Sequence, residues 1–321
     1  MKKNNLFETA GAVVLAVFLF TPQVTASESE TSSQDQCMLN FSELRNTYEK
    51  SNIEATVIDS KVRSTIEPYA LIHINKNGIS YTSWKALNNE VAGYALRQSK
   101  GFDFNQNRGF VGPLMWHQTL IWDKLFSNEY ELNGYECSIL GRTRLAGKRV
   151  TLLRLTPVDS LRYSYIISKD VDTGLPVELS IYAPGQGLVL KLTATSMGFA
   201  SDLNLNVPDE TFDRVEKLKP RVKTDENHVI WPELTIPKNF SFRYQEVQKF
   251  GDEEVPFQVF SDGLTEFRVY KNSRTSMNIG SATDGSLNVV RKNSRMHEYA
   301  VVGEIPLELC SIILSKISEY R

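Results

Sequence analysis

The sequence has few cysteines, few histidines and almost no net charge. Its 321 residues include three cysteines and four histidines, and the formal net charge is −2. The cysteines, Cys37, Cys137 and Cys310, are spaced for neither a zinc site nor a Cys-x-x-Cys redox pair. A protein that binds nucleic acid through its phosphates needs a strongly positive surface. The composition therefore supports neither metal nor thiol redox chemistry, and we expect no nucleic-acid partner.

The common catalytic motifs are also missing. The sequence contains neither Gly-x-Ser-x-Gly nor His-Glu-x-x-His. A Gly-x-Gly at 185–187 lies between two strand patterns, whereas a nucleotide-binding loop must lead into a helix. The four histidines stand far apart in sequence: His73, His117, His228 and His297. We predict no catalytic residue, no metal and no cofactor, hence no enzyme; a histidine–carboxylate pair formed only in the fold stays open.

One uncharged apolar run lies at the N-terminus. Ala10–Phe20 follows the positive residues Lys2 and Lys3 and is followed by small residues ending at Ala26. That order is typical of a secretory signal, and the run is shorter than the roughly 20 residues that span a bilayer. We predict a signal peptide over 1–26, cut after Ala26, and a periplasmic mature protein. The alternative is a buried N-terminal helix.

A helix is expected early in the mature chain. Residues 27–36 are polar and predict a disordered lead-in. Asn40 and Glu43 have the spacing of a capping box, and apolar residues at helical spacing follow them. We therefore expect a helix over 41–50.

The rest of the first half alternates as strands do, with one interruption. Asn77-Gly78 between two apolar runs is a strong hairpin signal. Residues 110–126 (FVGPLMWHQTLIWDKLF) break the strand rhythm and predict an amphipathic helical insertion. Strand patterns joined by short turns return from Leu140, as in an antiparallel meander. Such a sheet usually needs a cover on one face, which the two helices can supply.

A charged stretch that contains proline marks a domain boundary. Residues 214–223 (RVEKLKPRVK) carry five positive side chains and one negative. We place a linker at 214–228, between a first domain over 27–213 and a second over 229–321. Strand patterns and a final helix over 307–320 predict a small sheet with one helix for the second domain.

The cysteines leave several pairings open. The periplasm is oxidising, so an exported chain can form a disulfide there. Cys37 and Cys137 both lie in the first domain, which favours that pair. The odd count leaves at least one thiol free or paired between chains. The connectivity, and whether the protein is a homo-oligomer, therefore stay open.

The apolar insertion is the first candidate site. If it lies over a half-open sheet, the space between them is an apolar cavity that suits an alkyl chain. Plain core packing is the alternative, because aromatic residues dominate cores. The lipid-cavity candidates are Phe110, Leu114, Met115, Trp116, Ile121, Trp122, Leu125 and Phe126.

A basic stretch in the second domain is the other candidate site. Between residues 268 and 295 the only acid is Asp284. A basic face there could steer an acidic partner segment or contact lipid phosphates, and a solvated surface is the alternative. The partner-binding candidates are Arg268, Lys271, Arg274, Arg291, Lys292 and Arg295.

Several short segments between about Leu140 and Pro306 together form a recognisable series. The segments are Gly-Arg-Thr-Arg-Leu-Ala-Gly at 141–147, Arg-Tyr-Ser-Tyr-Ile at 162–166, Asp-Thr-Gly-Leu-Pro at 172–176, Trp231-Pro232 with Ile236-Pro237 and Phe240, Phe-Ser-Asp-Gly-Leu at 260–264, and Val-Val-Gly-Glu-Ile-Pro at 301–306. In this order they resemble one family, the RseB/MucB sigma-E regulatory proteins.

The resemblance implies a fold and a role. The fold class would be α+β: a large unclosed antiparallel β half-barrel like that of LolA and LolB, with covering helices, plus a smaller mixed α/β C-terminal domain that binds a partner. The role would be negative regulation of the sigma-E envelope stress response. Such proteins bind the periplasmic segment of an RseA/MucA-like anti-sigma factor and shield it from proteolysis. Acylated lipids, lipoproteins or lipopolysaccharide release this block.

Three other functions compete with this interpretation. A lipoprotein carrier of the LolA/LolB type would share the half-barrel, but the single-domain carriers lack a second domain. An envelope enzyme would have a pocket lined by acids or histidines instead of Phe and Trp. A structural envelope-binding module would use the basic stretch as its whole active surface.

Overall fold

The computed structural model describes most of the chain beyond the predicted signal peptide. The described residues are 32–61, 66–89, 92–98, 100–111, 117–205, 207, 211–212, 229–250, 252–273 and 281–317. The predicted signal peptide and the predicted linker lie outside them, so both stay predictions, as do the domain boundaries. By its contacts, Ser32–Arg321 forms one compact unit. Within the described residues, no helix combines the length and apolarity needed to cross a membrane.

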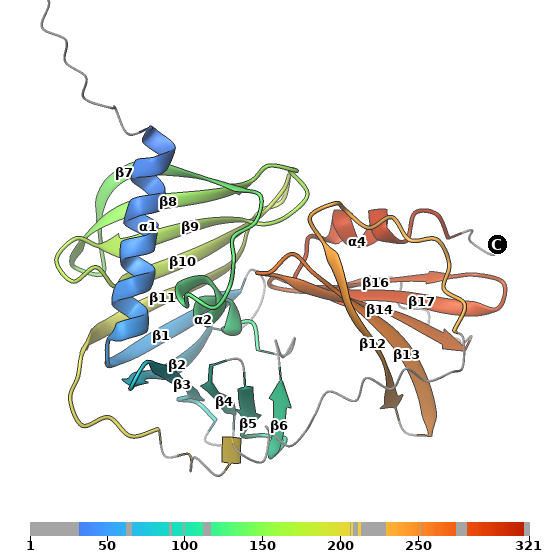
Figure 1. The fold of residues 1–321 in the computed structure, drawn as a ribbon, viewed down its shortest axis with the longest axis horizontal. Coiled ribbons are helices and arrows are strands. Elements are labelled where there is room, and N and C mark those ends of the chain that lie inside the picture. Colours follow the sequence, from blue (N-terminus) through green and yellow to red (C-terminus); the bar gives the residue numbers. More distant parts are fainter. Residues whose placement is uncertain are drawn as a thin grey trace, which may run out of the picture. The chain divides into compact units, whose positions relative to one another are not determined.

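The first half of the chain forms an 11-stranded antiparallel sheet (Figure 1). Its strands are β1 (Ile53–Lys61), β2 (Ile66–Lys76), β3 (Ile79–Ala86), β4 (Gly93–Arg97), β5 (Lys100–Asp103), β6 (Arg108–Val111), β7 (Tyr135–Leu145), β8 (Lys148–Pro157), β9 (Ser164–Asp170), β10 (Pro176–Ala183) and β11 (Gly187–Phe199). Their order is β6-β5-β4-β3-β2-β1-β11-β10-β9-β8-β7. The first and last strands therefore pair in the middle, and the edges β6 and β7 do not pair with each other. This confirms the predicted unclosed sheet.

The predicted hairpin is present at the expected residues. Strands β2 and β3 pair in register from Tyr69↔Ala86 to Lys76↔Ile79. Asn77 and Gly78 have φ values of 54° and 82°, the left-handed region that these two residue types tolerate best.

Helix α1 (Ser33–Lys50) lies across the large sheet and begins earlier than predicted (Figure 1). Its capping box is formed by Ser32 and Asp35, and the predicted box of Asn40 and Glu43 is wrong. The first residues of the helix are exposed and polar, so their composition resembles that of a disordered segment. The apolar face begins only at Cys37 and continues with Phe41, Leu44 and Tyr48, which are at most 1% exposed.

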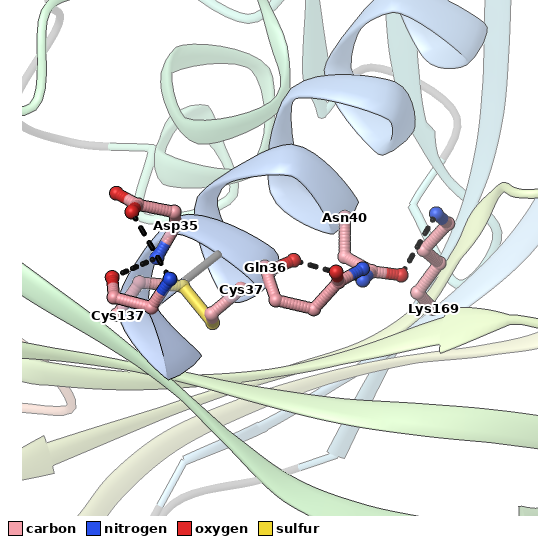
Figure 2. Close-up of a disulfide and its surroundings, with 7 residues drawn as sticks. Asp35, Gln36, Cys37, Asn40, Cys137 and Lys169 are labelled. Atoms are coloured by element: carbon pink, nitrogen blue, oxygen red, sulfur yellow. Dashed lines mark hydrogen bonds between the residues drawn. A yellow bond between two sulfur atoms is a disulfide. The ribbon is translucent and has the colours of Figure 1, made fainter. Parts of the chain in front are cut away.

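One disulfide fastens α1 to the edge of the sheet. It joins Cys37 of α1 to Cys137 of β7, 100 residues apart in sequence, with their Cα atoms 5.5 Å apart (Figure 2). The favoured pairing is confirmed. Cys310 is a buried free thiol.

The insertion between the two edge strands is only partly helical. Helix α2 spans Leu120–Phe126, and Arg108–Val111 is strand β6, paired with β5. The prediction of a helix over all of 110–126 is therefore wrong at its start, because residues that looked like helix extend the sheet. Residues 112–116 lie outside the described part of the chain.

The second half forms a six-stranded antiparallel sheet with one helix (Figure 1). The order β12-β13-β14-β17-β16-β15 is made by β12 (Ser241–Phe250), β13 (Glu253–Ser261), β14 (Glu266–Ser273), β15 (Ser281–Asp284), β16 (Leu287–Asn293) and β17 (His297–Gly303). Helix α4 (Leu307–Ile313) packs on one face with Phe267, Val269 and Val301. It is shorter than the predicted 307–320. The other face carries a smaller apolar cluster around Phe257 and Val259. The α+β fold class with two sheets is confirmed.

Candidate functional site at the contact between the two sheets

Helix α2 fills the concave side of the large sheet. The side chains of Ile121, Trp122, Leu125 and Phe126 are at most 2% exposed and belong to the main core. Their burial matches the core-packing alternative. Leu114, Met115 and Trp116, and the side chain of Phe110, lie outside the described residues, so a lipid cavity lined by all eight candidates stays a prediction.

A buried carboxyl lies on the same helix. Asp123 accepts a hydrogen bond from Trp84 Nε1 at 2.8 Å and from the hydroxyls of Tyr48 and Tyr94 at 3.3 Å. Burial raises the pKa of Asp123 to about 7, and the donors oppose this shift because they favour the ionised form. A cavity of about 30 Å³ lies beside it, which is room for about one or two waters.

Asp123→Asn should change how stability depends on pH. Between about pH 4 and 7 the folded protein keeps the proton on Asp123 and the unfolded chain does not, so this carboxyl lowers the free energy of unfolding as pH rises through that window. Asparagine does not titrate. As pH rises through this window, the free energy of unfolding of the variant should therefore increase relative to that of wild type by roughly 1 kcal/mol per pH unit. Urea unfolding of both proteins from pH 4 to 8 measures it. Asp59, whose pKa burial also raises to about 7, is present in both proteins and cancels. If the free energy of unfolding depends on pH in the same way for both proteins, the raised pKa of Asp123 is contradicted.

Residues at α2 also hold the small sheet. Lys124 Nζ lies 3.2 Å from Glu304 Oε2, and both side chains are at most 6% exposed. Gln118, just before α2, donates from Nε2 to the carbonyl of Asp284 at 2.8 Å and accepts from the Ser286 amide at 2.8 Å. Helix α2 and the residue Gln118 before it are therefore bonded to the end of β15, to the β15–β16 turn and to the residue that follows β17.

Arg162 makes a second connection. Its Nη1 donates to Asp262 Oδ2 at 2.8 Å and its Nε to Asp159 Oδ2 at 2.7 Å. Two further bonds reach the carbonyls of Asn133 and Gly134. The Arg162 and Asp262 side chains are 1% and 0% exposed. When the remaining hydrogen-bonding groups of a buried ion pair have partners in this way, the pair fixes the position of its two side chains. Removal of one partner then strongly destabilises the folded protein.

Apolar side chains cross the same contact in both directions. Leu264, from the β13–β14 turn, belongs to the core of the large sheet. Leu161, from the β8–β9 turn, packs against the core of the small sheet. Nearby, the Tyr163 hydroxyl donates to the Ser286 carbonyl and accepts from Asn288 Nδ2, both at 2.8 Å. The two sheets are thus joined by polar and apolar contacts.

A cleft of about 550 Å³ opens beside these connections. Its lining residues are Lys124, Glu129, Tyr130, Glu131, Asn133, Arg243, Tyr244, Ser261, Gly263, Leu264, Thr265 and Glu266. Glu266 is 7% exposed, and its Oε1 accepts no hydrogen bond from the described residues. Arg268 Nε is 3.7 Å away, beyond hydrogen-bond length. Burial raises the pKa of Glu266. The cleft therefore contains an unused buried acceptor.

The predicted basic residues do not form a single face. Arg268 and Arg291 lie in register with Val302 and Ala300, on the face away from α4. Lys271 and Lys292 both pair with Tyr299, whose side chain belongs to the α4 face. The reason is the strand repeat, because successive side chains point to opposite faces.

Most of these basic residues already have partners. Arg291 lies 3.1 Å from Glu298, and Lys271 Nζ donates to the Ile230 carbonyl at 2.7 Å. Arg295 is exposed, and Arg274 lies outside the described residues. A partner-binding role for the six stays a prediction.

The described histidines have different neighbours, and His228 lies outside the described residues. His73 is buried against Tyr48, with Nδ1 at 2.9 Å from Thr82 Oγ1. His117 Nε2 lies 2.9 Å from Asp103 Oδ2, a pair assembled only by the fold. In the part of the chain that the structure describes, no three His, Cys, Asp or Glu side chains are grouped to hold a metal ion.

Comparison with known families decides the relationship. Residues 40–214 match the MucB/RseB N-terminal domain, and residues 225–318 match the MucB/RseB C-terminal domain. The chain belongs to the MucB/RseB family. The earlier resemblance is thereby confirmed, and it extends over both halves of the chain.

Relatives in this family are named as regulatory proteins. The sigma-E factor regulatory protein RseB of Salmonella typhimurium is 22% identical over 195 residues, covering 57% of this chain and 59% of RseB. The sigma factor AlgU regulatory protein MucB of Pseudomonas aeruginosa is 27% identical over 184 residues, covering 54% of this chain and 57% of MucB. The matched region thus spans less than two thirds of either relative.

Solved MucB structures share the fold over a longer region. The Pseudomonas aeruginosa MucA/MucB complex matches with a TM-score of 0.61 at 16% identity, covering 89% of this chain and 99% of the matched one. A structure of MucB alone gives 0.54 at 17% identity, with 89% and 98% covered. The fold likeness therefore includes both sheets.

Proposed function

We propose that this protein is a periplasmic negative regulator of a sigma-E-type envelope stress response. It would bind the periplasmic segment of an RseA/MucA-like anti-sigma factor and shield that segment from proteolysis. The observation that carries the proposal is the match of both MucB/RseB domains, in order, on one chain. The MucB chain whose fold this protein shares was solved in complex with MucA, which supports the same partner class. The function would be binding, without catalysis, and the signal peptide would be cut after Ala26.

The structure suggests how an acylated lipid or lipoprotein would release the partner. An alkyl chain entering the large core would compete with the α2 side chains for the same space, and each buried CH₂ contributes about 0.8 kcal/mol. Moving α2 would separate Lys124 from Glu304 and leave a buried carboxylate unpaired. Lipid would thereby favour an arrangement with the small sheet detached from α2. The partner segment would favour the arrangement in which the small sheet is attached to α2. Allosteric coupling requires that the two ligands prefer different arrangements of the protein in this way.

The proposal is tested by titrating the purified mature protein into a labelled periplasmic segment of the host's anti-sigma factor. We expect saturable binding and slower cleavage of the segment by the first protease of the cascade. A scrambled segment of the same composition is the control. A segment that stays unbound, or that is cleaved at the same rate with and without the protein, would rule the function out.

A further inference from the structure

We propose that the anti-sigma segment binds as an added, extended strand along β12, with its polar side toward the cleft of about 550 Å³. This inference rests on the proposed function and deepens it, because it names the surface and the conformation of the partner. Two features of the described residues carry it: a long strand edge, and a cleft that Arg243 and Tyr244 of the same strand line.

The strand edge is long, and its described side chains, at 241–248, are all exposed or partly exposed. β12 has ten residues and ends the order of the six-stranded sheet, so it pairs with β13 on one side and with no described strand on the other. The opposite edge, β15, has four residues. Native proteins usually shorten or cover a free edge, because its unpaired N–H and C=O groups form a template for another strand. A ten-residue edge is therefore suited to strand addition.

The two sides of β12 differ in chemistry. Phe242 and Val247 are 54% and 37% exposed, and they pair with Phe260 and Pro256. Tyr244 pairs with Val259 on the other face and lines the cleft with its neighbour Arg243. A register shift between Phe242 and Tyr244 leaves Arg243 without a paired residue on β13, and Arg243 lines the cleft. An added strand would meet the exposed Phe242 and Val247 on one face, and Tyr244 beside the cleft on the other.

The cleft offers groups that such a strand can use. Glu266 Oε1 is buried and accepts no hydrogen bond from the described residues. Lys124 Nζ donates to Glu304 Oε2 at 3.2 Å, and an ammonium group can donate three hydrogen bonds. Charges of both signs line the cleft, so a strongly acidic or basic segment fits poorly. The occupant that matches is an extended segment in which apolar and uncharged polar residues alternate.

Backbone methylation of the partner tests strand addition directly. The probe is the shortest peptide of the host's anti-sigma segment that still binds the mature protein, made in two forms that are N-methylated at alternate residues. In a strand only every second N–H faces a given neighbour. One form should therefore lose affinity by about tenfold or more, and the complementary form should bind nearly as well as the unmodified peptide.

A matched pair of variants locates the edge. Val247→Lys places a charge on the exposed apolar face of β12 and should weaken binding by about tenfold. Ala282→Lys places the same charge on the exposed edge strand β15 and should leave affinity unchanged. Equal affinity of the two methylated forms, or equal affinity of the unmodified peptide for the two variants, would overturn the inference while the proposed function stands. A segment that fails to bind the wild-type protein would overturn both.

Discussion

Arg162→Met should lower the free energy of unfolding by about 3–5 kcal/mol, the usual cost of removing one partner from a buried ion pair. Asp262, whose side chain is 0% exposed, would lose its cationic partner, and the carbonyls of Asn133 and Gly134 would each lose a donor. Methionine retains much of the apolar stem of arginine, so the loss reports mainly on charge and hydrogen bonding. Urea unfolding followed by tryptophan fluorescence measures it.

The surface residue Arg154 supplies the control. It lies on neighbouring β8 with an exposed side chain, so Arg154→Met should change the free energy of unfolding by less than about 0.5 kcal/mol. Adding Asp262→Asn to Arg162→Met should recover part of the loss, because the unpaired charge is removed while the side-chain oxygen that caps the turn is kept. Equal stability of wild type and Arg162→Met would show that this pair does not hold the two sheets together.

Loss of the disulfide should have a similar effect by a different route. It closes a loop of 100 residues, and restricting the unfolded chain over that length stabilises the fold by about 4–5 kcal/mol in the chain-entropy model. Cys37→Ser and Cys137→Ser should therefore each destabilise the protein by about this amount, and the double variant by little more.

A reductant provides the check on that second prediction. Dithiothreitol should shift the urea midpoint of the wild-type protein toward that of the double variant and leave the double variant unchanged. Cys310 is a buried free thiol in all of these proteins, so it does not confound the comparison. A wild-type midpoint that does not respond to full reduction would contradict the predicted contribution.

Much of the fold could be predicted because its signals are local. Asn77-Gly78 allows the left-handed backbone that a tight hairpin requires, and the structure has the turn there. The start of α1 was mispredicted because Ser33–Gln36 are exposed polar residues, which look the same in a helix and in a disordered tail. The lysines and arginines at 268–295 were grouped by sequence proximity, whereas the strand repeat separates them to opposite faces.

The contact between the sheets could not be derived from sequence, because its partners are far apart in the chain. Arg162 and Asp262 are 100 residues apart, and Lys124 and Glu304 are 180 apart. A signal for it was nevertheless present. Arg162, Asp262 and Glu304 each lie within a segment that carries the family resemblance. In the structure all three of these residues lie at the contact.

We propose that one protein binds the anti-sigma segment and releases it when an acylated lipid binds. The most direct measurement is the affinity of the mature protein for that segment with and without a saturating lipid that bears acyl chains, with its deacylated form as the control. We expect tight binding of the segment, with an affinity that the acylated lipid lowers and the deacylated form leaves unchanged. Unchanged affinity when the lipid is bound would contradict it, because the two ligands would then share no conformational equilibrium.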